Sequence, residues 1–398
     1  MRIASFQFQA QWLATYMQQQ TAVAKLQMQV SSGQRLVQPS DDPAAAAQIA
    51  DLTSSNNAAT QYTANAGVAK DRLSNEDSLL QQAYNILQSV RELAVEAGNA
   101  ATSPSGLQAI ATNLQQDKSA LLAIANSQDA SGNYVFAGLR ARTQPFTTSG
   151  GATTYNGDAS QRSVQVGANQ TVVDGNSGTS IFVAIPNGNG TFVASAADTN
   201  TGTLVVGTRS VVNPAAWDGG SYTIQFLTPG SYQVVDASNN VVQSGSYSDG
   251  SAITFKGVSL TFSGTPAAGD TVTVAPSGTQ DVFQTIDQLV AATQNASGDA
   301  VSRTLAANAA GNSLENLDQA LQQLGNVQAS VGARLQTIDQ ATQGLADTSV
   351  SLTTSISNLG DTNYASAISS LTSMLTSLQA AQQTYAKVQG LSLFNYLR

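Results

Sequence analysis

Residues 317–359 read LDQALQQLGNVQASVGARLQTIDQATQGLADTSVSLTTSISNL, and every seventh position of this stretch is aliphatic. The series consists of Leu317, Leu324, Val331, Ile338, Leu345, Leu352 and Leu359. A second series, with smaller residues, consists of Leu52, Ala59, Ala66, Leu73, Leu80, Leu87 and Ala94. A seven-residue apolar repeat keeps one stripe of a helix facing a partner helix. We therefore expect the N- and C-terminal helices to pair along this seam as a coiled-coil rod.

The middle of the chain has a different pattern, with short β-type runs between about Tyr155 and Pro276. Turn pairs such as Asn187-Gly188 separate these runs, one of which is Ile181–Ile185. Upstream, Asn133–Gly138 is typical of one arm of a hairpin. The fold class predicted is α+β and multidomain, with paired terminal helices and an antiparallel β sandwich or barrel inserted at the tip of the rod.

Composition excludes several functional classes. The 398 residues contain no Cys and no His, which removes disulfides, thiol nucleophiles and the usual zinc ligands. Only 10% of the residues are charged and the net charge is −9, so a nucleic-acid partner is not expected. Three Asp- or Asn-containing turns supply too few carboxylates for calcium. We predict a protein that is not an enzyme, with no catalytic, cofactor-binding or metal-binding residues.

Two adjacent acidic pairs are the remaining candidates for carboxylate chemistry, and structural roles explain both. Asp42 precedes Pro43 at the start of a helix, where Asp is a favoured N-cap and Pro a favoured first residue. The negative charge of Asp41 would, like that of Asp42, interact favourably with the positive N-terminal end of the helix dipole. Glu76-Asp77 lies inside a predicted helix over 43–97, and we expect this pair to lie on a solvated face.

The N-terminal residues have no apolar core of the kind found in secretory signal peptides, and no stretch approaches the length of a membrane span. We therefore expect no membrane partner and, if the protein leaves the cell, another export route. Both terminal helices carry more apolar positions than one partner can cover. The predicted assembly interface consists of Ile3, Phe6, Leu13, Met17, Leu26, Tyr364, Leu371, Leu378, Tyr385, Leu393, Phe394 and Leu397.

The segment SSGQRLVQPSDDPAAAAQIA, residues 31–50, resembles the link between the inner domains of the flagellin superfamily of bacterial flagellar axial proteins. Six motifs resemble the hook-associated members of that superfamily. They are MRIAS at the start, PSDDP at 39–43, GNYVFAG at 132–138, TQPF at 143–146, YNGD at 155–158 and LSLFNYL near the end. Gln34 and Arg398 depart from the pattern, the first standing where a basic residue is common.

The resemblance implies three domains. They are an inner terminal-helix domain of residues 1–40 and 361–398, a helical rod with a β hairpin of residues 41–167 and 279–360, and an outer β domain of residues 168–278. It also implies a structural, extracellular component of the flagellum that links hook to filament and serves motility. The implied partners are further copies in a ring or helical layer, hook-associated protein 1, flagellin and a type III export chaperone.

We further expect residues 1–30 and 365–398 to be mobile in the monomer and to order on assembly, because isolated helices are marginal without packing. Two alternatives stay open from the sequence. One is a filament flagellin. The other is a secreted surface adhesin or enzyme whose activity, such as glycan binding, lies in the β domain.

Overall fold

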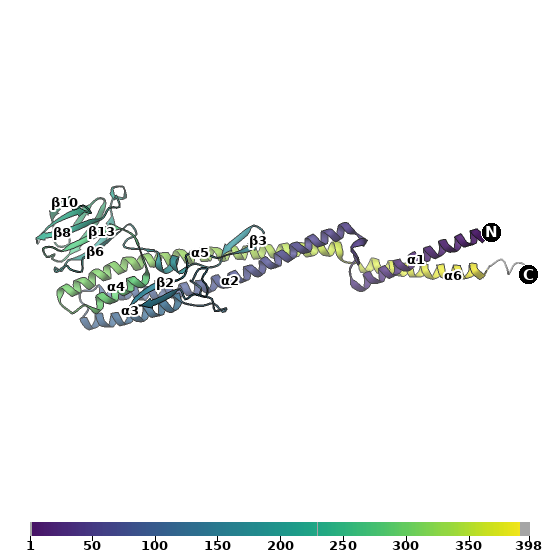
Figure 1. Cartoon of the computed structure of the whole chain (residues 1–398), viewed down its shortest axis with the longest axis horizontal. Helices are drawn as coiled ribbons and strands as arrows, with labels where there is room; N and C mark the ends of the chain where they lie inside the picture. Colours follow the sequence, from purple (N-terminus) through teal and green to yellow (C-terminus); the bar gives the residue numbers. More distant parts are fainter. Residues whose placement is uncertain (1, 229, 391–398) are drawn as a thin grey trace, which may run out of the picture. The chain divides into compact units, whose positions relative to one another are not determined.

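The computed structural model describes residues 2–228 and 230–390 (Figure 1). The chain forms two compact units: residues 1–64 with 341–398, and residues 65–340. Two long helices, α2 (Pro43–Ala97) and α5 (Ala300–Gly360), contribute residues to both units.

The first unit contains α1 (Arg2–Ser32), the short 3-10 helix η1 (Pro39–Asp41) and α6 (Tyr364–Gly390), together with residues 43–64 of α2 and 341–360 of α5. Pro43 is the first residue of α2, and the Oδ1 atom of Asp42 accepts a hydrogen bond from the Ala45 amide at 3.1 Å. The seam residues Leu52 and Leu345 belong to this unit and are half-buried.

In the second unit α2 and α5 run antiparallel, and three polar contacts define their register. Lys70 Nζ lies 2.7 Å from Asp339 Oδ1, Gln328 Nε2 donates to Gln81 Oε1 at 3.4 Å, and Arg91 Nε lies 2.6 Å from Asp318 Oδ1. Between the first and last contacts, α2 advances 21 residues and α5 goes back 21 residues. The register therefore does not slip over three heptads.

In this register the seven-residue series of α2 and that of α5 lie alongside each other and run in opposite directions. The seam residues of the second unit are all fully buried: Leu73, Leu80, Leu87, Ala94, Leu317, Leu324, Val331 and Ile338. The second core position of each α2 heptad is also buried, and it is occupied by Ala69, Glu76, Ala83, Val90 and Ala97. Our expectation that Glu76 lies on a solvated face is therefore wrong, because its side chain is 0% exposed at a core position.

Two further helices complete the helical part of this unit, α3 (Pro104–Ala125) and α4 (Val282–Gln294), which pack against each other. The ammonium of Lys118 on α3 lies 2.6 Å from an Asp287 carboxylate oxygen on α4. A cluster of aromatic rings, with neighbouring centroids 5.0–6.1 Å apart, lies at one end of these helices. It consists of Phe136, Phe146, Tyr155, Phe182 and Phe283.

The hairpin next to these helices is formed by β1 (Phe146–Ser149) and β2 (Ala152–Tyr155). The predicted strand at Asn133–Gly138 is wrong. That segment consists of turns with a single bridge from Gln128 to Tyr134, and Gly132 and Gly138 adopt φ values of 77° and 67° that an extended strand does not contain.

A second hairpin, β3 (Ser163–Gly167) with β4 (Gln170–Val173), precedes a π-helical turn, η2 (Thr179–Val183). This turn corrects the predicted strand at Ile181–Ile185, since only the last of these residues is extended. Ile185 and Pro186 form β5, which pairs with β14 (Thr279–Gln280). The chain therefore leaves the helical part and returns to it through two adjacent strands.

Between β5 and β14 lies an antiparallel sandwich. One sheet has the order β10-β9-β8-β13-β6 and the other β11-β12-β7. The strands are β6 (Phe192–Ala196), β7 (Val205–Val211), β8 (Tyr222–Thr228), β9 (Ser231–Asp236), β10 (Val241–Ser246), β11 (Ala252–Phe255), β12 (Val258–Ser263) and β13 (Thr271–Pro276). Alternate residues of both sheets, such as Phe226 and Leu260, share one buried core. The predicted α+β fold with an inserted antiparallel domain is confirmed, and of the two expected forms the domain is a sandwich.

Three asparagines at four-residue spacing attach the sandwich to α5. Asn308 accepts from the Val206 amide at 2.8 Å and donates to the Leu204 carbonyl at 2.9 Å. Asn312 accepts from Arg209 at 2.6 Å, and Asn316 accepts from the Gly188 amide at 2.7 Å. Asn308 and Asn316 thus satisfy backbone groups that would otherwise be buried without partners, and Asn312 satisfies the Arg209 side chain.

Shortening a seam side chain should destabilise the helical part of the second unit. We expect Leu87→Ala to lower the free energy of unfolding by about 2–5 kcal/mol, because Leu87 is fully buried and its removal leaves a cavity. Val95→Ala, on the same helix but 52% exposed, should cost less than about 0.5 kcal/mol. Thermal unfolding followed by circular dichroism measures both, and equal losses would contradict the proposed seam.

Removing one of the three asparagines, Asn308, Asn312 or Asn316, should weaken the attachment of the sandwich to α5. We expect Asn308→Ala to cost about 2 kcal/mol or more, because the Val206 amide and the Leu204 carbonyl both lose their partner. Asn326→Ala, at an exposed position of the same helix, should change little. Urea unfolding followed by Trp217 fluorescence in a Trp12→Phe background measures the difference, because Trp217 packs against the sandwich core.

Candidate assembly surface

The contact between α1 and α6 centres on aromatic rings. The Trp12 and Tyr385 rings stack with centroids 3.7 Å apart at an interplanar angle of 15°. Tyr16 also stacks on Trp12, with centroids 5.2 Å apart, and its hydroxyl accepts a hydrogen bond from Gln382 Nε2 at 2.9 Å. These contacts fix an antiparallel pairing of the two helices.

Apolar residues continue this contact toward the end of α1. Val23 and Ala367 are buried, at 8% and 7% exposure. The remaining positions of the inward stripe are half-buried, namely Leu26, Leu371 and Leu378. A two-helix pair cannot bury either helix all round, so one face of each helix is left to solvent.

The outward faces of both helices are also apolar. Among the predicted interface residues, Phe6 is 73% exposed, Leu13 51%, Met17 59% and Tyr364 51%. Four residues absent from our predicted interface are exposed beside them: Met28, Ile368, Leu375 and Val388. Ile368 and Leu375 lie seven residues apart, and from this spacing we expected them to fill the second core position of the helix. The structure instead leaves them 50% and 40% exposed.

The structure therefore divides the predicted interface into two groups. Leu26, Leu371, Leu378 and Tyr385 are half-buried, while Phe6, Leu13, Met17 and Tyr364 are more than half exposed. Ile3 lies in α1. Leu393, Phe394 and Leu397 lie outside the described residues.

The segment 33–42 ties this helix pair to the connection between α5 and α6. The Arg35 guanidinium donates to the Leu359 carbonyl at 2.7 and 3.1 Å, and the Arg35 amide donates to the Gly360 carbonyl at 2.7 Å. Gln34 forms a β-bridge with Asp361. The segment thus closes on the C-terminal half of the same unit.

Asp41 holds the other side of this segment. Its carboxylate lies 2.7 Å from Lys25 Nζ and accepts from the Val37 and Gln38 amides, both at 3.2 Å. The hydrogen bond from Lys25 lowers the pKa of Asp41 below its usual range. Asp41 therefore stays ionised and keeps α1 tied to the turn that precedes α2.

Few charges interrupt the outward faces. Between Tyr364 and Val388, α6 carries a single charged residue, Lys387. Paired helices with exposed apolar faces and so little charge favour contact with other protein surfaces. Within residues 2–228 and 230–390, no group of three or more acidic residues could hold a metal ion, and no helix combines the length and apolarity that a membrane span requires.

Comparison with known proteins agrees with this arrangement of helices. The bacterial flagellin N-terminal helical region matches residues 3–141, and the bacterial flagellin C-terminal helical region matches residues 314–397. A crystal structure of Xanthomonas campestris FlgL is 37% identical, with a TM-score of 0.73 over 76% of this chain and 98% of that one. The chain belongs to the FlgL family.

Two other FlgL relatives extend the comparison. The crystal structure of flagellar hook associated protein-3 from Legionella pneumophila is 28% identical, with a TM-score of 0.75 over 78% of this chain and 98% of that one. Flagellar hook-associated protein 3 of Salmonella typhimurium is 34% identical over 185 residues, which are 46% of this chain. That match spans 58% of the length of the Salmonella protein.

The stack of Trp12 on Tyr385 should stabilise the helix pair, whereas the exposed neighbour Leu13 should contribute little to its stability. We expect Trp12→Ala to destabilise the α1–α6 contact by about 2 kcal/mol, because it removes the stack on Tyr385 and the apolar area behind it. Amides of residues 378–388 would then exchange with deuterium about 30-fold faster. Leu13→Ala should leave their exchange unchanged, and equal acceleration in both variants would contradict this division of roles.

Proposed function

We propose that the protein is a structural component of the bacterial flagellum that links hook to filament, and that it acts without catalysis. The observation that carries the proposal is the outward apolar face of α1 and α6, which a single copy leaves exposed. The named relatives support the same role, since they are hook-associated proteins and one solved structure is that of the flagellar junction protein FlgL from Legionella pneumophila, at 29% identity.

Assembly proceeds by packing these faces between copies. In each copy the inward stripe holds α1 on α6, while Phe6, Leu13, Met17 and Tyr364 meet a neighbouring copy in a ring or helical layer. Burial of apolar area supplies the free energy, at about 25 cal/mol per Å². Ile3, Leu393, Phe394 and Leu397 belong to the same proposed interface.

The layers above and below the ring are hook-associated protein 1 and flagellin. Before assembly the chain is exported by the flagellar type III route, and a chaperone covers its C-terminal helix. Exposed apolar residues on α6, such as Ile368 and Leu375, support the need for such a cover, because they would otherwise promote aggregation. The assembled protein lies outside the cell.

The terminal helix pair gains order on assembly. Its inward contact consists largely of half-buried residues, and helices of this kind depend on tertiary packing for their stability. The amides of residues 6–30 and 365–388 should therefore exchange faster in the monomer than in the assembled layer.

The assembly role is tested by polar substitutions on the outward face. We expect Leu13→Ser combined with Ile368→Ser to retain the helical content of the purified monomer but to fail to restore motility and filaments to a strain lacking the gene. The side chains are 51% and 50% exposed, so their loss costs the monomer little. Val241→Ser, on the sandwich and 57% exposed, serves as the matched control and should restore both.

Two outcomes would contradict the proposal. Normal filaments in the double variant would show that the outward face does not carry assembly. Long filaments formed by the purified protein alone would instead indicate a filament flagellin. A glycan-binding screen with the full chain tests the adhesin alternative separately.

A further inference from the structure

Glu76 breaks the apolar pattern of the α2 seam. It stands between Leu73 and Leu80 at a heptad core position, and its side chain is 0% exposed. The register set by Lys70 with Asp339 and by Gln81 with Gln328 places Arg334 level with it on α5. A polar layer therefore crosses an otherwise apolar helix contact.

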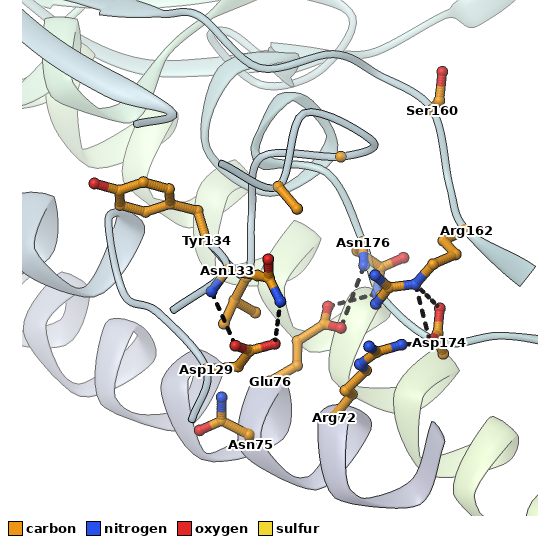
Figure 2. A pocket seen from close by; sticks show the side chains of 14 residues that line it. Arg72, Asn75, Glu76, Asp129, Asn133, Tyr134, Ser160, Arg162, Asp174 and Asn176 are labelled. Atoms are coloured by element: carbon orange, nitrogen blue, oxygen red, sulfur yellow. Dashed lines mark hydrogen bonds and ion pairs between the residues drawn. The ribbon is translucent and has the colours of Figure 1, made fainter. Parts of the chain in front are cut away.

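The Glu76 carboxylate is held by one residue of the neighbouring loop. Oε1 accepts from Asn176 Nδ2 at 2.7 Å, and Oε2 accepts from the Asn176 backbone amide at 3.3 Å (Figure 2). Arg334 donates to the same Asn176 side chain, on Oδ1 at 3.2 Å. Asn176 thus joins the carboxylate of α2 to the guanidinium of α5.

Two other carboxylates at the site have partners of their own. The side chain of Asp174 is fully buried, and its carboxylate forms ion pairs with Arg72 at 2.7 Å and with Arg162 at 2.8 Å. Asp129 accepts from the Ser131 and Asn133 amides at 2.8 and 3.0 Å. The titratable and charged groups that surround Glu76 are Arg72 on α2, Arg334 on α5, and Asp129, Tyr134, Arg162 and Asp174 on the loops.

The loop that Asn176 belongs to depends on these contacts. Residues 174–177 form neither helix nor strand, yet Asp174, Asn176 and Ser177 are buried. Irregular backbone at such depth needs side-chain partners for its polar groups. Beside it lies a cavity of about 40 Å³ with room for water, and the polar side chains of Glu76, Asn75 and Asn133 contribute to its lining.

We propose that Glu76 is a proton-operated latch, which in its neutral form closes the segment 174–178 onto the α2–α5 seam and in its charged form drives local opening of that segment. The neutral carboxyl sits in the seam without the cost of a buried charge: its carbonyl oxygen still accepts from Asn176 Nδ2, and its hydroxyl donates to water in the adjoining cavity. The charged carboxylate gains hydration when the segment opens, and water enters from the adjoining cavity.

The balance of charges supports this behaviour. Burial raises the pKa of Glu76 from 4.5 to about 7, against the hydrogen bonds from Asn176 and the positive charge of Arg334. The closed state therefore binds a proton more tightly than the open or unfolded state. The contribution of Glu76 protonation to the stability of the closed state is fully present below pH 4.5, falls as the pH rises, and levels off above about pH 7.

Hydrogen exchange of the full-length protein at different pH values tests the latch. Protection factors, which correct for the intrinsic pH dependence of exchange, should fall about 30-fold between pH 5.5 and pH 8 for the amides of residues 174–178. In Glu76→Gln, which keeps the shape but cannot ionise, these protection factors should be independent of pH. Glu92→Gln, at an exposed position of the same helix, should behave as the unmodified protein does.

Each outcome of this experiment decides the proposal. Constant protection of residues 174–178 in the unmodified protein would overturn it without any variant. A parallel fall in Glu76→Gln would assign the pH dependence to other groups, such as Asp281 and Glu315, whose pKa values burial also raises. A fall confined to proteins that retain Glu76 supports the latch.

Discussion

The antiparallel contact between α2 and α5 is the interaction on which the second unit depends. Its register is held at both ends by ion pairs, Lys70 with Asp339 and Arg91 with Asp318. Apart from Glu76, the described core positions between these pairs are filled by aliphatic side chains. Exposed ion pairs contribute little free energy, so burial of the leucines provides the stability and the charges specify the alignment. Other elements attach to these two helices: α3 through Asp117 with Ser89 of α2, and the sandwich through Val206 with Asn308 of α5.

α5 serves two partners with two faces. Its heptad positions, such as Leu317 and Leu324, face α2, while Asn308, Asn312 and Asn316 hold backbone and side-chain groups of the sandwich. Hydrogen bonds to buried backbone groups are costly to lose, which makes the orientation of the sandwich on α5 specific as well as stable. The polar face is thus as much a part of the fold as the apolar one.

The sequence predicted the seam because a seven-residue period is a global property that survives local irregularity. It predicted the sandwich from turn pairs and alternating strands. The burial of Glu76 was missed because an acid in a helix is usually solvated. Its position three residues after Leu73 nevertheless belongs to the seam, and Asn176 of the neighbouring loop supplies the hydrogen bonds that a buried carboxyl needs. The segments Asn133–Gly138 and Ile181–Ile185 were predicted as strands from their composition. The first forms turns in which glycine adopts positive φ, and the second is largely a π-helical turn.

For the assembly surface the sequence predicted the helices but could not orient them. Two apolar stripes run along α1, and periodicity alone does not distinguish the stripe that faces α6 from the one that faces solvent. The stacking of Trp12 on Tyr385 makes that distinction, because it depends on how two distant segments meet. Contacts between residues so far apart in the chain leave no local signal in the sequence.

The pairing of β5 with β14 has a consequence for how such a protein can change over time. Because Ile185 lies beside Gln280, the chain enters and leaves the sandwich at nearly the same point. Whatever is enclosed between these strands can grow, shrink or be exchanged without changing the length of any helix. Only the surface that meets the asparagines of α5 must be kept, so the sandwich is free to diversify while the helices that build the assembly stay as they are.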